Sequence, residues 1–151
     1  MCIRDRAGTT TTIDQASQNL SLNWASFNIA PQESVNFVQP SAAAIAINRI
    51  FDTNGTQILG HLNANGQIFL INPNGVLFGS GSQVDVGGLI ATTLDVSGAD
   101  AGNSKVFSGS GSGSVINAGT ITAASGGYVA LLGNHVGNQG TICLLYTSRC
   151  V

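Results

Sequence analysis

Charge is what this sequence has least of. Asp, Glu, Lys and Arg together make up 8 % of its 151 residues, against about 25 % in an average domain. A nucleic-acid-binding surface needs clustered Lys and Arg to neutralise phosphates. The chain has five basic residues and a net charge of −2, so we expect no nucleic-acid partner. Its length is nevertheless sufficient for one domain with a real core.

Long hydrophobic runs and catalytic groupings are also lacking. No stretch approaches the roughly 18 apolar residues that a membrane-spanning helix needs, so we expect no such transmembrane segment. Catalysis needs convergent ionisable groups, and no GxSxG, Walker or dinucleotide fingerprint is present. His61 and His135 have no HxxxH or cysteine partner. We therefore predict no enzyme activity, no metal and no cofactor.

Cysteine is missing from the middle of the chain. All three cysteines, and three of the five basic residues, lie within residues 1–6 and 143–151. These two ends resemble translated adapter sequence, so we interpret them as non-native and residues 7–142 as the natural segment. That segment keeps two basic and six acidic side chains and no cysteine. A cysteine-free chain fits a protein that crosses membranes unfolded.

Glycine, asparagine, serine and threonine are abundant instead. They form turns such as Asn65-Gly66 and Gly126-Gly127 between short runs rich in Val, Ile and Leu, which is an all-β pattern. The predicted strands are Leu20–Trp24, Val35–Val38, Gln57–Leu59, Gln67–Ile71, Val76–Phe78, Gln83–Val86, Leu89–Leu94, Val115–Ile116, Thr120–Thr122, Tyr128–Leu132 and Thr141–Ile142.

The segment Gly66–Gly79 shows this pattern most clearly. Two apolar runs flank the tetrapeptide Asn72-Pro73-Asn74-Gly75. Proline fixes φ near the value a turn requires, and Asn and Gly tolerate positive φ. The sequence therefore predicts a strand, a tight turn and a second strand here.

A repeat favours one all-β architecture. Asn117-Ala118-Gly119-Thr120-Ile121 returns 21 residues later as Asn138-Gln139-Gly140-Thr141-Ile142, and Asn65-Gly66 and Asn74-Gly75 carry a related signature. A period of about 20 residues with short strands is typical of a parallel β-solenoid. The alternative is an antiparallel sandwich with hairpins at Asn-Gly.

Several local features allow two interpretations. Ser41–Ile50 could be a helix capped by Ser41, but we favour a strand at Ala44–Asn48. We expect Ser108–Ser114, which is SGSGSGS, to be a floppy loop between coils rather than a domain boundary. Asp52–Gly55 is interpreted as an ordinary turn, not a calcium loop. We expect Arg49 to pair with a carboxylate or with backbone carbonyls.

An ordered set of motifs resembles a known family. The set consists of Leu22–Ile29, Val35–Pro40, Ala46–Ile50, Gly66–Val76 and Gly87–Ser97. Together they are similar to the N-terminal haemagglutination-activity domain of two-partner-secretion exoproteins, the filamentous haemagglutinin and high-molecular-weight adhesin type. The resemblance covers residues 7–142 and implies a right-handed parallel β-helix with an N-terminal β cap.

The resemblance also implies a function. Such a domain takes a large exoprotein to its dedicated outer-membrane β-barrel transporter, whose periplasmic POTRA domains bind it. The product is secreted or held at the bacterial surface, and a receptor or glycan of a host would be bound by the passenger. The implied secretion motif is Asn72, Pro73, Asn74 and Gly75, and Asn48 matches another recurrent asparagine. Val76 replaces the more usual isoleucine, and the haemagglutinin subgroup's NPNL motif is missing.

Two other functions compete with this one. A β-helix polysaccharide lyase or hydrolase would need acids and cations clustered on a groove, and two cations in residues 7–142 leave little to build one. A delivery module of a contact-dependent toxin would share the same sequence features. The sequence also leaves open whether the transporter reads the Asn72–Gly75 turn directly or the turn makes the first coils fold.

Overall fold

The chain folds into a right-handed parallel β-helix of about five turns. The structure is a computed structural model and describes residues 2–97, 106–109, 111–144 and 149–150. All secondary-structure elements in these ranges are strands, in three sheets and one small hairpin. No helix in the described ranges is long and apolar enough to cross a membrane.

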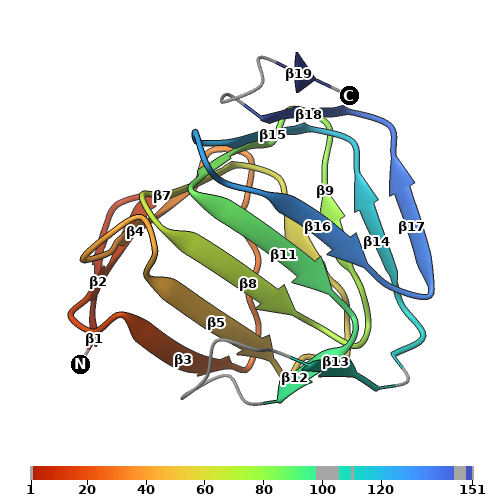
Figure 1. The fold of residues 1–151 in the computed structure, drawn as a ribbon, viewed down its shortest axis with the longest axis horizontal. Coiled ribbons are helices and arrows are strands. Elements are labelled where there is room, and N and C mark those ends of the chain that lie inside the picture. The colour runs from red at the N-terminus through yellow and green to blue at the C-terminus, as the bar shows by residue number, and fades with distance from the viewer. Residues whose placement is uncertain (1, 98–105, 110, 145–148, 151) are drawn as a thin grey trace.

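Three sheets, here named A, B and C, form the walls of the solenoid (Figure 1). Sheet A contains, in spatial order, β1 (Cys2–Ala7), β2 (Thr10–Gln15), β4 (Ser34–Val38), β7 (His61–Ala64), β10 (Gln83–Val86), β15 (Thr120–Ala123), β18 (Thr141–Leu144) and β19 (Arg149–Cys150). Sheet B contains β3 (Asn19–Trp24), β5 (Ile45–Ile50), β8 (Gln67–Ile71), β11 (Gly88–Thr92) and β16 (Val129–Leu132). Sheet C contains β6 (Thr56–Ile58), β9 (Val76–Phe78), β14 (Ser114–Asn117) and β17 (His135–Asn138).

Each turn of the solenoid visits the sheets in the order A, B, C. Strands of successive turns pair in parallel, as β4 with β7 and β8 with β11, and this pairing excludes the antiparallel sandwich. Strand β1 pairs antiparallel with β2 and covers the N-terminal edge of sheet A, which is the expected cap. Strand formation does not test where a segment comes from, so the foreign origin of residues 1–6 and 143–151 stays a prediction.

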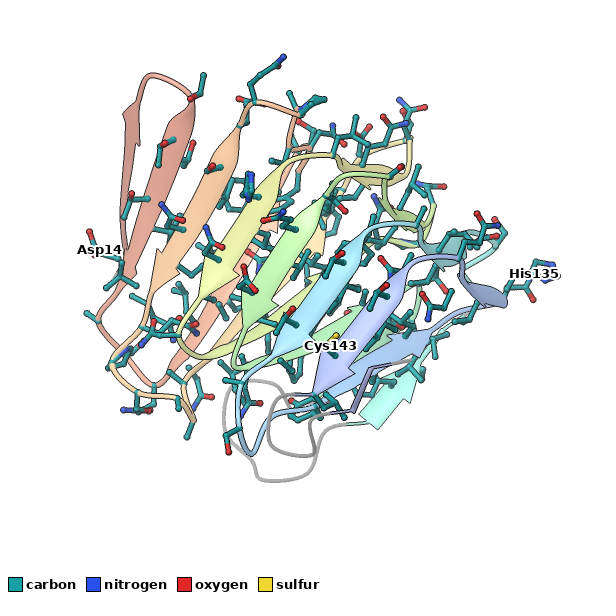
Figure 2. The ribbon with its side chains drawn as sticks, turned by 90° about the horizontal axis from the view of Figure 1, so that it is seen from above. Asp14, His135 and Cys143 are labelled. Carbon is teal, nitrogen blue, oxygen red and sulfur yellow. The ribbon has the colours of Figure 1, made fainter. Side chains whose placement is uncertain are left out.

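The core is a set of apolar columns inside the solenoid. Leu62, Val84 and Ile121 occupy the same register on successive strands of sheet A, and all three are at most 1 % exposed. Alternate side chains of each strand point inward, so a residue is covered by its equivalents one turn before and one turn after. Asp14 on β2 and Cys143 on β18 lie toward opposite ends of sheet A (Figure 2). The outward row that reaches Cys143 is polar on the preceding strands, where Asn36, Asn63, Asp85 and Thr122 share one register.

The 21-residue repeat is confirmed as one turn of the solenoid. Asn117 pairs in register with Asn138, and Thr120 with Thr141. Asn65-Gly66 and Asn74-Gly75, which carry a related sequence signature, lie at two different corners of one turn and are not equivalent positions of the repeat. The first joins β7 to β8 and the second joins β8 to β9.

Glycine is required where the corners of sheets A and B stack. A Cβ atom on Gly87 would lie 2.7 Å from the carbonyl oxygen of Gly66, one turn earlier. A Cβ atom on Gly127 would come closer still to the carbonyl of Gly87. The backbones therefore approach at a distance that leaves no room for a side chain.

The segment Ser41–Ile50 forms a strand, not a helix. Strand β5 begins at Ile45 and ends at Ile50, slightly later than the predicted Ala44–Asn48. Its side chains alternate between two apolar environments, because Ala46 and Ile50 pack inside the solenoid while Ile47 packs on its outer face. A helix would leave one of these environments unfilled.

A hairpin leaves the fourth turn and packs on sheet B. Strands β12 (Asp95–Ser97) and β13 (Val106–Ser108) pair antiparallel. Phe107 contacts Phe69 with ring centroids 6.2 Å apart, over an outer apolar cluster that includes Ile47 and Ile90. Arg49 forms an ion pair of 3.2 Å with Asp95, which confirms the expected carboxylate partner.

We expect the hairpin to be held by its apolar contact more than by its ion pair. Phe107→Ala should lower the free energy of unfolding by about 2 kcal/mol, because it uncovers Phe69. Asp95 is 69 % exposed, so Asp95→Asn should cost less than about 1 kcal/mol. Urea denaturation of both variants measures this order, and a larger loss for Asp95→Asn would contradict it.

Candidate functional site

The candidate site is the corner at Asn72–Gly75, where the chain passes from sheet B to sheet C. The backbone N–H of Gly75 donates to the carbonyl oxygen of Asn72 at 2.9 Å and closes the turn. Gly75 has φ of +114°, which a glycine adopts without strain. The predicted strand, turn and strand are therefore all confirmed, with both strand boundaries as expected.

Asn72 is the centre of this corner. Its side chain is fully buried, and its Oδ1 accepts a hydrogen bond from the backbone N–H of Asn74 at 2.9 Å. Its Nδ2 donates to the carbonyl oxygen of Asn54 at 3.1 Å and to the hydroxyl of Thr56 at 3.0 Å. One side chain thus fixes its own turn and binds the corner of the preceding coil.

Pro73 and Asn74 form the outer part of the turn. Both are exposed, whereas Gly75 is buried. The Asn74 side chain donates to the carbonyl oxygen of Asp52 at 2.7 Å, again on the preceding coil. Of the four residues of the turn, Pro73 and Asn74 are therefore accessible to a partner, and Asn72 and Gly75 are buried.

The following coil covers the same corner and corrects one expectation. The N–H of Gly113 donates to the carbonyl oxygen of Pro73 at 3.1 Å. A Cβ atom on Gly113 would collide with the backbone of Asn74 and Gly75, and one on Gly111 would collide with the backbone of Thr93. The prediction of a floppy loop at Ser108–Ser114 is therefore wrong for Gly111 and Gly113, whose small size allows close packing. Ser110 lies outside the described residues.

Asn48 lies away from this corner, inside strand β5. Its Oδ1 accepts a hydrogen bond from Nε1 of Trp24 at 2.9 Å, and its Nδ2 donates to the carbonyl oxygen of Phe69 at 3.2 Å. The side chain is fully buried. It ties three consecutive coils together at sheet B, and these hydrogen bonds do not reach Asn72.

Sequence reasoning missed the partners of Asn72. Asn54 and Thr56 bind Asn72, and Gly113 binds the Pro73 carbonyl. Asn54 and Gly113 were singled out only as members of the Asp52–Gly55 turn and the Ser108–Ser114 segment, and neither was expected at this corner. Residues far apart in the sequence meet here because each coil repeats the corner at the same place. No local pattern could have shown which hydroxyl or carbonyl would face Asn72.

The chemistry that the corner offers is hydrogen bonding. A shallow groove beside it is lined by amide, hydroxyl, glycine and aliphatic groups, including Asn54, Asn74 and Leu77. Across the described residues, no three His, Cys, Asp or Glu side chains gather in a way that could hold a metal ion. His61 lies on strand β7 of sheet A, and His135 lies on strand β17 of sheet C.

Comparison with known proteins decides the family. The sequence model of the family described as "TPS secretion domain" matches residues 3–143. The chain belongs to the TPS (two-partner secretion) domain family. The crystal structure of the HMW1 secretion domain from Haemophilus influenzae superposes with a TM-score of 0.82 at 29 % identity. The match covers 95 % of this chain and 40 % of that one.

Two curated relatives of the TPS domain share one name. A heme/hemopexin-binding protein of Haemophilus influenzae strain Rd is 39 % identical over 145 residues, which cover 89 % of this chain and 16 % of the relative. A second heme/hemopexin-binding protein of Haemophilus influenzae is 45 % identical over 85 residues, covering 56 % of this chain and 9 % of the relative. The chain therefore spans less than a fifth of the length of either relative.

Proposed function

We propose that this TPS domain delivers an exoprotein to a dedicated outer-membrane β-barrel transporter and is bound by the transporter's periplasmic POTRA domains. The observation that carries the proposal is the match of a secretion-domain family to residues 3–143, joined to the fold shared with the HMW1 secretion domain. Secretion is the function of the family. The transporter and its POTRA domains are the proposed partners of this chain.

The fold supports a mechanism of capture followed by stepwise folding. We propose that the chain is unfolded or loosely folded in the periplasm, where POTRA domains add its strand-forming segments to their sheet edges. Each strand of the solenoid pairs mainly with the strands one turn before and one turn after. Folding can then begin at one end and proceed coil by coil outside the cell, which favours export in one direction.

We propose that Asn72, Pro73, Asn74 and Gly75 serve secretion by building a corner that the first coils need. The support is the burial of Asn72 and its hydrogen bonds to Asn54 and Thr56 on the preceding coil. Asn48 has the same role on sheet B, through Trp24 and Phe69. Direct reading of the turn is the competing hypothesis, and it would depend on the exposed pair Pro73 and Asn74.

The location of the exported protein follows from the same proposal. The exported protein would be secreted or held at the bacterial surface, and a passenger beyond this segment would bind a host receptor or glycan. Binding of heme or hemopexin is stated for the two Haemophilus relatives, of which this chain matches a small part. No observation favours a polysaccharide lyase or a toxin-delivery module, so no second function is proposed.

An export assay tests the proposal. The exoprotein that carries this domain is produced in a Gram-negative host with its cognate transporter, with a transporter lacking the POTRA domains, or with none. We expect the protein in the medium or at the surface with the intact transporter alone. Equal export in all three strains would contradict the proposal. A periplasmic protein without a TPS domain controls for leakage.

A further inference from the structure

Three Asn-Gly dipeptides lie at corners of the solenoid. In the part of the chain that the structure describes, only one of them has both its asparagine side chain and its glycine N–H without a hydrogen bond. An Asn-Gly sequence can convert itself, because the glycine nitrogen attacks the asparagine side chain and no Cβ hinders the approach. The reaction requires a free glycine N–H and a side chain that can rotate toward it. Asn54-Gly55, Asn65-Gly66 and Asn74-Gly75 differ in both respects.

The pair Asn65-Gly66 is restrained at both ends. Oδ1 of Asn65 accepts a hydrogen bond from the backbone N–H of Gln39 at 2.8 Å, and its Nδ2 donates to the Gln39 carbonyl at 2.7 Å. The N–H of Gly66 donates to Oε1 of Gln39 at 2.9 Å. Gln39 is 5 % exposed, so one buried side chain and its backbone hold both reacting groups.

The pair Asn74-Gly75 is restrained in a similar way. Nδ2 of Asn74 donates to the carbonyl oxygen of Asp52 at 2.7 Å. The N–H of Gly75 donates to the carbonyl oxygen of Asn72 at 2.9 Å. The nucleophile and the side chain that it would attack are again both engaged.

The pair Asn54-Gly55 has neither restraint. Asn54 is exposed. Its backbone N–H donates to Asp52 Oδ1 and its carbonyl accepts from Asn72 Nδ2. Within the described part of the chain, its side-chain amide and the N–H of Gly55 have no hydrogen-bond partner.

We propose that Asn54 is a site of spontaneous deamidation and isomerisation in the folded domain. The Gly55 nitrogen forms a bond to Cγ of Asn54, the bond from Cγ to Nδ2 breaks, and ammonia leaves with the proton from the Gly55 N–H. Water then opens the resulting cyclic imide at either carbonyl, which gives aspartate or isoaspartate. Asn65 and Asn74 are protected as long as their coils are folded.

The product changes the corner that Asn72 holds. Isoaspartate carries the main chain through its side-chain carbon, which adds a methylene and displaces the carbonyl oxygen that Asn72 binds. Either product also places a new negative charge beside Asp52. The folded domain would therefore lose contacts between its second and third coils as Asn54 reacts.

Site-resolved mass spectrometry of the intact chain tests the proposal. The protein is incubated at mildly alkaline pH in native buffer or in urea, and deamidation is followed by peptide mapping, with isoaspartate detected by enzymatic methylation. In native buffer we expect Asn54 to react at least about tenfold faster than Asn65 or Asn74. In urea the three rates should become similar.

Two variants sharpen the result. Asn54→Gln should abolish the native-state signal and identifies its peptide. Gln39→Leu removes the acceptor of the Gly66 N–H but keeps the backbone bonds that hold the Asn65 side chain. In this variant Asn65 should therefore accelerate only in part and stay slower than Asn54, and Asn74 should stay unchanged. The proposal is wrong if Asn65 or Asn74 reacts as fast as Asn54 in the folded wild-type protein. It is equally wrong if Asn54 reacts in urea but stays intact in native buffer.

Discussion

Replacing Asn72 by alanine is expected to lower the free energy of unfolding by about 3 kcal/mol. The substitution removes the acceptor for the N–H of Asn74 and the donor for the Asn54 carbonyl and the Thr56 hydroxyl. Asn72 and Thr56 are at most 1 % exposed, so water cannot fully replace these bonds. Urea denaturation monitored by far-ultraviolet circular dichroism measures the loss.

Asn74→Ala is the matched control for this effect. Asn74 belongs to the same turn and also binds the preceding coil. Its side chain is exposed and, among the described residues, has one hydrogen bond, to Asp52. We expect it to cost less than about 1 kcal/mol. Similar losses for the two variants would show that the buried network does not determine the stability of the corner.

Replacing Gly113 by valine should destabilise the domain by about 3 kcal/mol or more. A Cβ atom at this position would collide with the backbone of Asn74 and Gly75 on the preceding coil. Backbone atoms cannot move aside as the end of a flexible side chain can, so the two coils would have to separate. The hydrogen bond from Gly113 to the Pro73 carbonyl would be lost with them.

Ser112→Val separates this packing effect from a change in loop composition. Ser112 is adjacent, is exposed, and belongs to the same Gly/Ser-rich segment. We expect its unfolding midpoint in urea to stay close to that of the wild-type chain. A tolerant Gly113→Val variant would restore the interpretation of this segment as a floppy loop.

The alternation of apolar and turn residues predicted the fold well where strands are short and bounded by glycine or asparagine. Gln67–Ile71, Val76–Phe78 and Gln83–Val86 match the structure at both ends. Strands β2 and β7 were not predicted from the sequence. Thr10–Gln15 and His61–Ala64 contain few apolar residues, and only some of the side chains in each strand are buried. Their neighbours on adjacent coils, rather than their own propensity, make them strands.

The candidate site was predictable only in its local part. Asn72–Gly75 could be recognised as a turn because proline fixes its own φ and glycine accepts the positive φ that the turn requires. The contacts with Asn54, Thr56 and Gly113 depend on how the coils stack, which a local pattern does not contain. The same limit explains the Gly/Ser-rich segment, whose composition suggests flexibility while Gly113 is in fact required for close packing.

Whether the corner serves secretion through folding can be measured by the export of three chains by the cognate transporter: wild type, Asn72→Ala, and the double variant Pro73→Ala/Asn74→Ala. If the corner serves secretion through folding, Asn72→Ala should reduce the folded, exported protein several-fold, and the double variant should stay near wild type. If export of the double variant is lost while its stability is retained, the transporter recognises the exposed turn directly, and a role through folding is contradicted.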